Sequence, residues 1–244
     1  MNITYQQTQE AMAASLAPGD DVLVHASLGR IGQLEAGVDS LITALCSVIG
    51  ESGTLIMMTD TRSFASTRRF SMSQPSETGL LTERFRLTPG VVRSCVPMVS
   101  FCAFGQRQAL YTERYQSHLD ETATMSQLLK NDAKVMMMGI GFEKCTLYHL
   151  AEERLGSSYN FYKDFTGVLV ASGEEDQHIS QRYFVRRDMS TKKDPSIAGR
   201  MLEAEGAARS VPFGNGMIRT FRARDFDECC MRALSANPNA FLAN

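Results

Sequence analysis

Apolar and polar residues follow each other along this chain in a pattern that predicts strands joined by helices. Two short apolar runs, at 21–25 and 54–59, are bounded by turn-forming residues and predict strands. Between them apolar residues recur every three or four positions and end at Gly50, the series being Val38, Leu41, Ile42, Leu45, Val48 and Ile49. This spacing is typical of one buried helix face, so the segment predicts a strand–helix–strand unit.

A third apolar run, at 135–140, leads through a short loop into a helix whose first turn carries His149. We expect the hydroxyl of Thr146 to cap this helix by accepting from a free N–H of the first turn. In open α/β sheets, ligands usually bind at the carboxyl ends of the strands, where such loops leave backbone N–H groups free. The pattern therefore places a basic side chain at the edge of the sheet where chemistry is expected.

The middle of the chain has few periodic segments, and we expect residues 60–130 to be rich in loops. Residues 60–78 are polar and lack periodicity, which is typical of a long loop that binds a ligand, and we predict a substrate lid there. A short helix is predicted at 79–86, because Pro89 and Gly90 stop it. The next predicted strand after 54–59 is the one at 135–140.

The last third of the chain predicts two antiparallel hairpins and two helices. The first hairpin joins stretches at 167–171 and 179–185 through a polar turn at 172–176, and the second is centred on 214–216. Helices are expected at 197–208 and 224–234. Together the elements predict one domain over residues 1–244 with an α/β fold, a layered α/β/α sandwich with a central mixed sheet and added antiparallel hairpins.

The composition is that of an ordinary globular protein and narrows the range of partners. The chain has 244 residues and a formal net charge of -2 with interspersed signs, so we expect no nucleic acid and no membrane as partner. Residues 1–8 carry no basic or apolar segment of signal type, which predicts a cytoplasmic protein. Six cysteines without a C-x-x-C pair predict reduced thiols and no metal site.

His149 is the strongest candidate for catalysis. The positive end of a helix dipole disfavours the imidazolium, which keeps the ring in the neutral form that accepts a proton. Glu152 lies three residues further on, hence on the same helix face, where it would fix the tautomer of His149 or bind a cationic substrate amine. A neutral base beside a carboxylate suits proton removal from an amine or a hydroxyl. The competing interpretation is a hydrogen-bonded structural histidine beside a solvated acidic face.

Cysteine 145 and the other histidines carry weaker hypotheses. Cys145 would be a nucleophile with His149 as its partner in a thioester-forming hydrolase or amidase, although a role as a small apolar core residue suits it better. His118 and His178 are expected at the surface. The arginine pairs and clusters at 68–69 and 182–187 are expected to lie on solvated faces.

Three further residues have groups that suit a cofactor. The loop after the first strand offers Ser27 and backbone N–H groups to a phosphate or a pantetheine amide. Arg93 and Ser100 offer a cation and a hydroxyl in a second segment, although an arginine and a serine in a loop are more often structural.

Five motifs in order along the chain are more specific than any one of these residues. They are 24–28 (VHASL) with Ile31-Gly32, 53–55 (GTL), 79–86 (GLLTERFR) with 89–94 (PGVVRS), Pro97 with Ser100-Phe101, and 146–152 (TLYHLAE). This series resembles the aminoglycoside 3-N-acetyltransferase family, antibiotic N-acetyltransferases that use acetyl-CoA and differ in fold from the GNAT acetyltransferases. Two positions depart from the family: Val96 stands where members often carry His or Asn, and Met125 where proline is common.

The resemblance implies roles for individual residues. His149 matches the family's catalytic histidine and Glu152 the acidic residue beside it, while Ser27, Arg93 and Ser100 lie in segments that match the lining of the coenzyme A channel. It implies acetyl-CoA as co-substrate, no metal, and direct transfer in a ternary complex with His149 as general base toward the attacking amine. It also implies a homodimer.

The acceptor implied by the resemblance is a small-molecule amine, the 3-amino group of the 2-deoxystreptamine ring of an aminoglycoside antibiotic. Such polycations require carboxylates, and Asp60, Glu83 and Glu152 are the candidate substrate-binding residues. Arginines near Asp60 would suit a phosphorylated acceptor better, so biosynthetic acylation of a nucleotide-linked amino sugar or an aminophosphonate is an alternative. A third interpretation, of another class, is a non-catalytic coenzyme A-binding or interaction protein on this fold.

Overall fold

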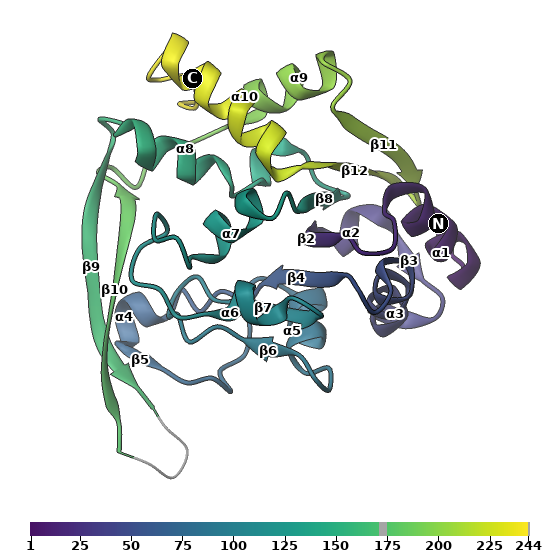
Figure 1. The fold of residues 1–244 in the computed structure, drawn as a ribbon, viewed down its shortest axis with the longest axis horizontal. Helices are drawn as coiled ribbons and strands as arrows, with labels where there is room; N and C mark the ends of the chain where they lie inside the picture. Colours follow the sequence, from purple (N-terminus) through teal and green to yellow (C-terminus); the bar gives the residue numbers. More distant parts are fainter. Residues whose placement is uncertain (171–174, 244) are drawn as a thin grey trace.

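A mixed β-sheet runs through the centre of the protein, whose computed structural model describes residues 1–170 and 175–243 (Figure 1). Within these residues the sheet has seven strands in the order β11–β12–β8–β2–β4–β7–β6. In chain order they are β2 (Asp21–Ala26), β4 (Thr54–Met58), β6 (Val92–Arg93), β7 (Phe101–Gly105), β8 (Lys134–Met138), β11 (Ala208–Phe213) and β12 (Gly216–Arg222). β2 pairs in parallel with β4 and β8, and the other neighbours are antiparallel, which confirms the predicted mixed sheet.

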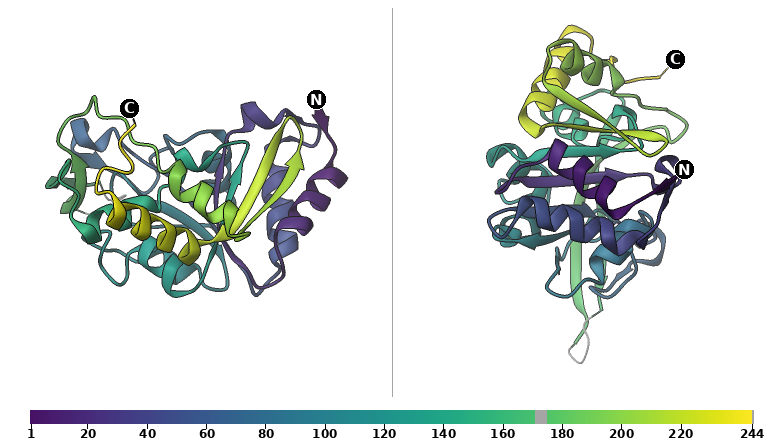
Figure 2. Two further views of the ribbon diagram at one scale, coloured as in Figure 1. Left: turned by 90° about the horizontal axis from the view of Figure 1, so that it is seen from above. Right: turned by 90° about the vertical axis from the view of Figure 1, so that its right-hand side faces the viewer.

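Helices cover both faces of this sheet and give the predicted α/β/α layers (Figure 2). One face packs on α1 (Tyr5–Ser15), α3 (Gly37–Ile49) and α5 (Leu80–Arg86). The other packs on α6 (Gln108–Thr112), α7 (Thr124–Lys130), α8 (Tyr148–Leu155), α9 (Ser196–Ala204) and α10 (Ala223–Ala236). Within β2, Leu23 belongs to one buried cluster and its neighbours Val22 and Val24 to the other. Because the central strands are buried on both faces, their sequences are continuous apolar runs.

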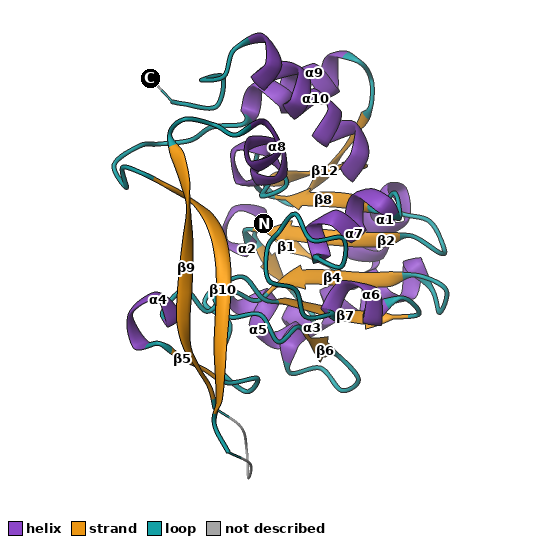
Figure 3. Ribbon diagram, turned by 60° about the vertical axis from the view of Figure 1, so that its left-hand side comes forward, coloured by secondary structure: helices purple, strands orange, loops and turns teal. Residues whose placement is uncertain are grey.

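Both predicted hairpins are present. β9 (Asn160–Leu169) and β10 (Gln177–Arg186) pair along their whole length as a long antiparallel ribbon, and β11 and β12 form the second hairpin. Residues 172–174 of the turn predicted at 172–176 lie outside the described residues. The carboxyl ends of β8 and β4 point toward the β9–β10 ribbon, which stands beside that edge of the sheet (Figure 3).

Two parts of the chain differ from the prediction. The stretch 60–78 contains α4 (Phe64–Thr67) and β5 (Arg69–Phe70), and β5 pairs in parallel with β9. No strand was predicted between 59 and 135, yet β6 and β7 lie there. The sequence of β7, Phe-Cys-Ala-Phe-Gly, lacks β-branched residues, and its first three positions are all buried, so no alternation of apolar and polar positions marks it as a strand.

Short elements complete the described part of the chain. β1 (Asn2–Ile3) pairs in parallel with β3 (Gln33–Leu34), α2 (Leu28–Ile31) follows β2, and the 3-10 turn η1 (Phe142–Lys144) precedes α8. The helix predicted at 197–208 ends earlier, at Ala204, because the chain turns into β11 at Ala208. The six cysteines are free thiols. None of the helices described is both long enough and apolar enough to cross a bilayer.

Candidate functional site

The carboxyl ends of the central strands surround a pocket of about 330 Å³. β2 contributes His25 and the following Ser27, Asp60 follows β4, and Lys144 lies in the segment after β8. Gly139, which follows β8, has a φ of 67°, and a Cβ on it would lie 3.0 Å from the carbonyl oxygen of Ser27. Glycine therefore lets the loops after β2 and β8 approach each other at this edge.

His149 occupies the first turn of α8, as predicted, but Thr146 does not cap the helix. The N-cap residue is Leu147, and the hydroxyl of Thr146 donates instead to the sulfur of Met58, 3.3 Å away. The predicted cap is wrong because the end of β4 places this sulfur within reach of the hydroxyl. The N–H of His149 donates to the carbonyl of Thr146 at 3.2 Å, which holds the histidine at the start of the helix.

The side chains of His149 and Glu152 are in contact. Nδ1 of His149 lies 3.2 Å from Oε2 of Glu152. The Glu152 side chain is fully buried whereas that of His149 is 38% exposed, so the imidazole is the partner that a substrate can reach. An ionised carboxylate only accepts hydrogen bonds, so the contact favours the neutral tautomer with its hydrogen on Nδ1. Nε2 then carries the free lone pair.

The charges around this pair favour a neutral histidine and an ionised glutamate. Burial lowers the pKa of His149 below its ordinary 6.5; the contact with Glu152 raises it, and the charges of Lys193 and Arg186 lower it. Burial raises the pKa of Glu152, but the hydrogen bond from His149 and the charge and hydrogen bond of Lys193 outweigh burial and bring it below 4.5. The pair therefore has the protonation states that a general base and its orienting carboxylate require.

Glu152 is held by three residues that sequence reasoning missed. Its Oε1 accepts from the hydroxyl of Tyr159 at 2.9 Å, and its Oε2 accepts from Nδ2 of Asn160 at 3.3 Å and Nζ of Lys193 at 2.7 Å. A substrate amine bound by this carboxylate would compete with those donors. No sequence pattern marks Lys193, which lies 41 residues from Glu152 along the chain.

Cys145 is poorly suited to act as a nucleophile. Its side chain is fully buried, and burial raises the pKa of its thiol to about 12. The reactive thiolate is therefore scarce at neutral pH. Among the residues that the structure describes, no group of three or more His, Cys, Asp or Glu side chains is arranged to hold a metal ion.

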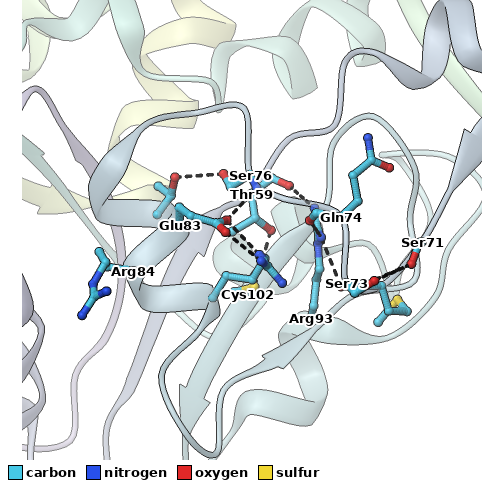
Figure 4. A network of polar contacts seen from close by, with 12 residues as sticks. Thr59, Ser71, Ser73, Gln74, Ser76, Glu83, Arg84, Arg93 and Cys102 are labelled. Carbon is cyan, nitrogen blue, oxygen red and sulfur yellow. Dashed lines mark hydrogen bonds and ion pairs between the residues drawn. The ribbon is translucent and has the colours of Figure 1, made fainter. Parts of the chain in front are cut away.

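Arg93 lies in a buried network that holds the loop at 71–76 (Figure 4). Buried Ser100 is one of its hydrogen-bond partners. The guanidinium donates to Oγ of Ser100 at 3.0 Å and to main-chain carbonyls, namely those of Thr59 at 2.7 Å, Met72 at 3.2 Å and Gln74. Ser27 does not belong to this network; it lines the pocket with a hydroxyl that makes no capping hydrogen bond. Two of the three predicted cofactor residues are therefore neighbours, and their polar groups serve the protein backbone.

Replacing Arg93 by methionine is expected to lower the free energy of unfolding by about 3 kcal/mol, because buried carbonyls lose a charged donor. Urea unfolding would measure the change. Arg84→Met is the matched control, since Arg84 is exposed and its ion pair within the described residues is with exposed Asp39; the stability of this variant should stay close to that of the original chain. Equal stability of the two variants would contradict the bracing role of Arg93.

Asp60 and Glu83, both predicted to bind substrate, differ in whether their carboxyl oxygens already have hydrogen-bond partners. Glu83 accepts from Arg86 at 2.7 and 2.9 Å and from the N–H of Ser76 at 2.7 Å. Asp60 is 1% exposed and its Oδ2 accepts from Arg62 at 3.0 Å, whereas its buried Oδ1 has no partner within the described residues. Burial raises the pKa of Asp60 to about 6. Asp60 is thus the carboxyl group with a free acceptor beside the pocket.

His118 was predicted at the surface, and that prediction is wrong. Its ring lies between those of Tyr115 and Tyr183, at centroid distances of 5.8 and 5.1 Å, and Nδ1 is buried with no partner in the described parts of the chain. Burial lowers the pKa of His118 to about 3. The polar residues next to His118 in the sequence suggest exposure, and the sequence does not show that Tyr183 of the distant strand β10 covers the ring. His178 is exposed, as predicted.

The two positions that depart from the family pattern are core positions. Val96 is fully buried with Tyr115 and Ala123, and Met125 is buried in the cluster under α7. Both apolar side chains fill volume that a polar residue would occupy only with a hydrogen-bond partner.

Comparison with known proteins gives consistent relatives over most of the chain. The sequence profile described as aminoglycoside 3-N-acetyltransferase matches residues 23–235. Aminoglycoside N(3)-acetyltransferase IV of Salmonella sp is 26% identical over 236 residues, which cover 93% of this chain and 85% of the relative. The SPbeta prophage-derived aminoglycoside N(3')-acetyltransferase-like protein YokD of Bacillus subtilis is 28% identical over 173 residues, which cover 61% of this chain and 64% of the relative.

Solved structures share the fold. AAC-IIIb in a binary complex with CoASH superposes with a TM-score of 0.84 at 22% identity and covers 97% of both chains. AAC-VIa bound to sisomicin has a TM-score of 0.83 at 18% identity and covers 97% of this chain and 98% of the other. The profile match spans most of the chain and the solved structures share its fold, so the chain belongs to the aminoglycoside 3-N-acetyltransferase family, a family of acyltransferases.

Proposed function

We propose that this protein is an acetyl-CoA-dependent N-acetyltransferase that acts on the 3-amino group of the 2-deoxystreptamine ring of an aminoglycoside. The observation that carries the proposal is the contact between His149 and buried Glu152 at the carboxyl edge of the sheet, in a chain of this family. Because Glu152 contacts Nδ1 of the His149 ring, Nε2 is left as the accessible proton acceptor. The coenzyme A-bound and sisomicin-bound relatives support the choice of donor and acceptor.

In the proposed mechanism His149 is the general base. Its Nε2 takes a proton from the acceptor amine as the amine nitrogen attacks the carbonyl carbon of the acetyl thioester, and backbone N–H groups stabilise the oxyanion. The carbon–sulfur bond then breaks, and the imidazolium returns the proton to the leaving thiolate, so the products are the amide and coenzyme A. Glu152 stabilises the transient imidazolium through Nδ1 and keeps the ring oriented.

The pocket at the carboxyl edge supports the binding of an anion as well. Arg30, Arg62 and Lys144 line it, against a single carboxyl group, Asp60. These cations suit the phosphates of coenzyme A, with Ser27 beside them, or those of a phosphorylated acceptor. Acylation of a nucleotide-linked amino sugar or an aminophosphonate is therefore the second candidate function.

Thiol release from acetyl-CoA by the purified protein tests the proposal. The panel contains kanamycin-, gentamicin- and neomycin-class aminoglycosides, nucleotide-linked amino sugars and an aminophosphonate, with a reaction lacking acceptor as the blank. We expect release with aminoglycosides, and NMR of the product should place the new amide on the 3-amino group. Release with phosphorylated acceptors alone would favour the second candidate, and coenzyme A binding without release from any acceptor would favour a non-catalytic protein.

A further inference from the structure

A buried lysine lies directly behind the His149–Glu152 pair. Lys193 belongs to the segment between β10 and α9, and its side chain is only 4% exposed. Its Nζ donates to Oε2 of Glu152 at 2.7 Å and to Oδ1 of Asn160 at 3.0 Å, and it lies 5.7 and 5.2 Å from the ring centroids of Tyr148 and Tyr159. Removing an ammonium from water is costly, so a lysine in this position requires partners that offset the cost.

We propose that Lys193 is a positioning residue that acts through Glu152, fixing this carboxylate so that it accepts from Nδ1–H of His149 and leaves Nε2 free to act as the base. The inference rests on the proposed function of His149. It assigns Lys193 no contact with substrate. The three side chains form a buried chain of contacts, Nζ to Oε2 at 2.7 Å and Oε2 to Nδ1 at 3.2 Å, that ends at the exposed imidazole.

Charge explains why a cation belongs on the far side of the glutamate. A carboxylate beside a histidine orients the ring but also raises the pKa of the imidazole, which would leave the base protonated and inactive. The charge of Lys193 opposes that rise and favours the ionised carboxylate, so the orienting contact is kept while the imidazole stays neutral. The charge of Arg186, from β10, also lowers the pKa of His149. His118 faces His149 from the loop before α7, and its ring is neutral.

A second strand segment holds Lys193 in place. Residues 192–194 lie antiparallel to residues 241–243, with a bridge between Lys193 and Leu242. The N–H of Asp194 donates to the carbonyl of Phe241 at 2.8 Å, and the N–H of Ala243 donates to that of Lys192 at 3.0 Å. Phe241 is fully buried and meets the ring of Tyr148 edge-on at 5.6 Å. Segment 241–243 therefore fixes the backbone of the lysine and the residue next to His149 together.

The test is an NMR titration of the ring nitrogens of His149, which needs no acceptor and no turnover. In the original protein we expect the neutral ring to carry its hydrogen on Nδ1. Lys193→Met should raise the pKa of His149 by about one unit, and so should Lys193→Gln, which keeps a donor but lacks the charge. Lys193→Arg should stay near the original value. Lys192→Met, a change of the exposed neighbouring lysine, is the matched control and should leave the titration unaltered.

The expected rise in the pKa of His149 also predicts the activity of Lys193→Met and Lys193→Gln, the two variants that lack the positive charge. At pH values below the pKa of His149, kcat/KM should fall about tenfold relative to the original protein and recover as the pH rises. An Nε2–H tautomer in the original protein, or an unchanged pKa in folded Lys193→Gln, would overturn the proposal. If the titration behaves as expected while the original protein acetylates no acceptor, the proposed function fails and the role of Lys193 at the pair stands.

Discussion

Replacing His149 by alanine is expected to lower kcat/KM for acetyl transfer about 10³-fold, the largest effect of any single substitution considered for this protein. The reason is that the attacking amine must lose a proton as it forms the amide, and Nε2 of His149 is the accessible acceptor oriented by a buried carboxylate. Thiol release from acetyl-CoA with the best acceptor of the panel measures the change. Most of the loss should appear in kcat, because His149 is assigned to the chemical step.

The matched control is His178→Ala, which removes an exposed histidine on β10 and should leave the rate unchanged. A second, independent check is the pH profile of the original protein. The base is active when neutral, so the rate should rise with pH through the pKa of His149, which lies below the ordinary 6.5, and then level off. Full activity of His149→Ala would remove this residue from the mechanism.

The part of the site that the sequence predicts is local. An apolar run followed by a loop and a helix places His149 at the carboxyl edge of a sheet, and the three-residue spacing of Glu152 places both side chains on one helix face. Both features follow from backbone periodicity. The structure has them, with Nδ1 and Oε2 3.2 Å apart, although Leu147 rather than Thr146 begins the helix.

The part that the sequence does not predict depends on contacts between distant segments. Lys193 and Asn160 reach Glu152 from 41 and 8 residues away, and His118 is covered by Tyr183 of the distant strand β10 as well as by nearby Tyr115. A polar residue in a polar stretch gives no sign of whether a remote strand will cover it.

Arg93 illustrates the same limit in a different way. The sequence identifies a cation near hydroxyls, which suits a phosphate as well as it suits backbone carbonyls. Only the fold brings the carbonyls of Thr59, Met72 and Gln74 around the guanidinium, so its hydrogen bonds brace a loop. The strand β7, which positions Ser100 at its start, was also missed, because a short buried segment of Phe, Cys and Ala carries no alternation.

Lowering the pH from 7 to 5 is expected to reduce the free energy of unfolding by about 3 kcal/mol, because two histidines that burial keeps neutral in the folded state outweigh the opposite contribution of the Asp60 carboxyl group. Burial lowers the pKa of His25 to about 4 and that of His118 to about 3, from the ordinary 6.5 that applies in the unfolded chain. As the pH falls through 6.5, the unfolded chain binds protons that the folded chain does not. Stability therefore decreases toward acid; the lowered pKa of His149 acts in the same direction, whereas the raised pKa of Asp60 acts in the opposite direction and offsets part of the loss.

The variant His118→Phe separates this effect from the protonation of carboxylates. Phenylalanine keeps an aromatic ring between Tyr115 and Tyr183, and the buried Nδ1 that it removes has no hydrogen-bond partner in the described ranges. Stability at pH 7 should be preserved, and about half of the loss between pH 7 and pH 5 should disappear, since one of the two neutral histidines is gone. Urea unfolding at several pH values between 5 and 7 measures this slope, with exposed His178→Gln as the control for removing a histidine. If His118→Phe showed the same slope as the original protein, His118 would have to be protonated in the folded state, and its burial between the two tyrosines could not be the source of the acid sensitivity.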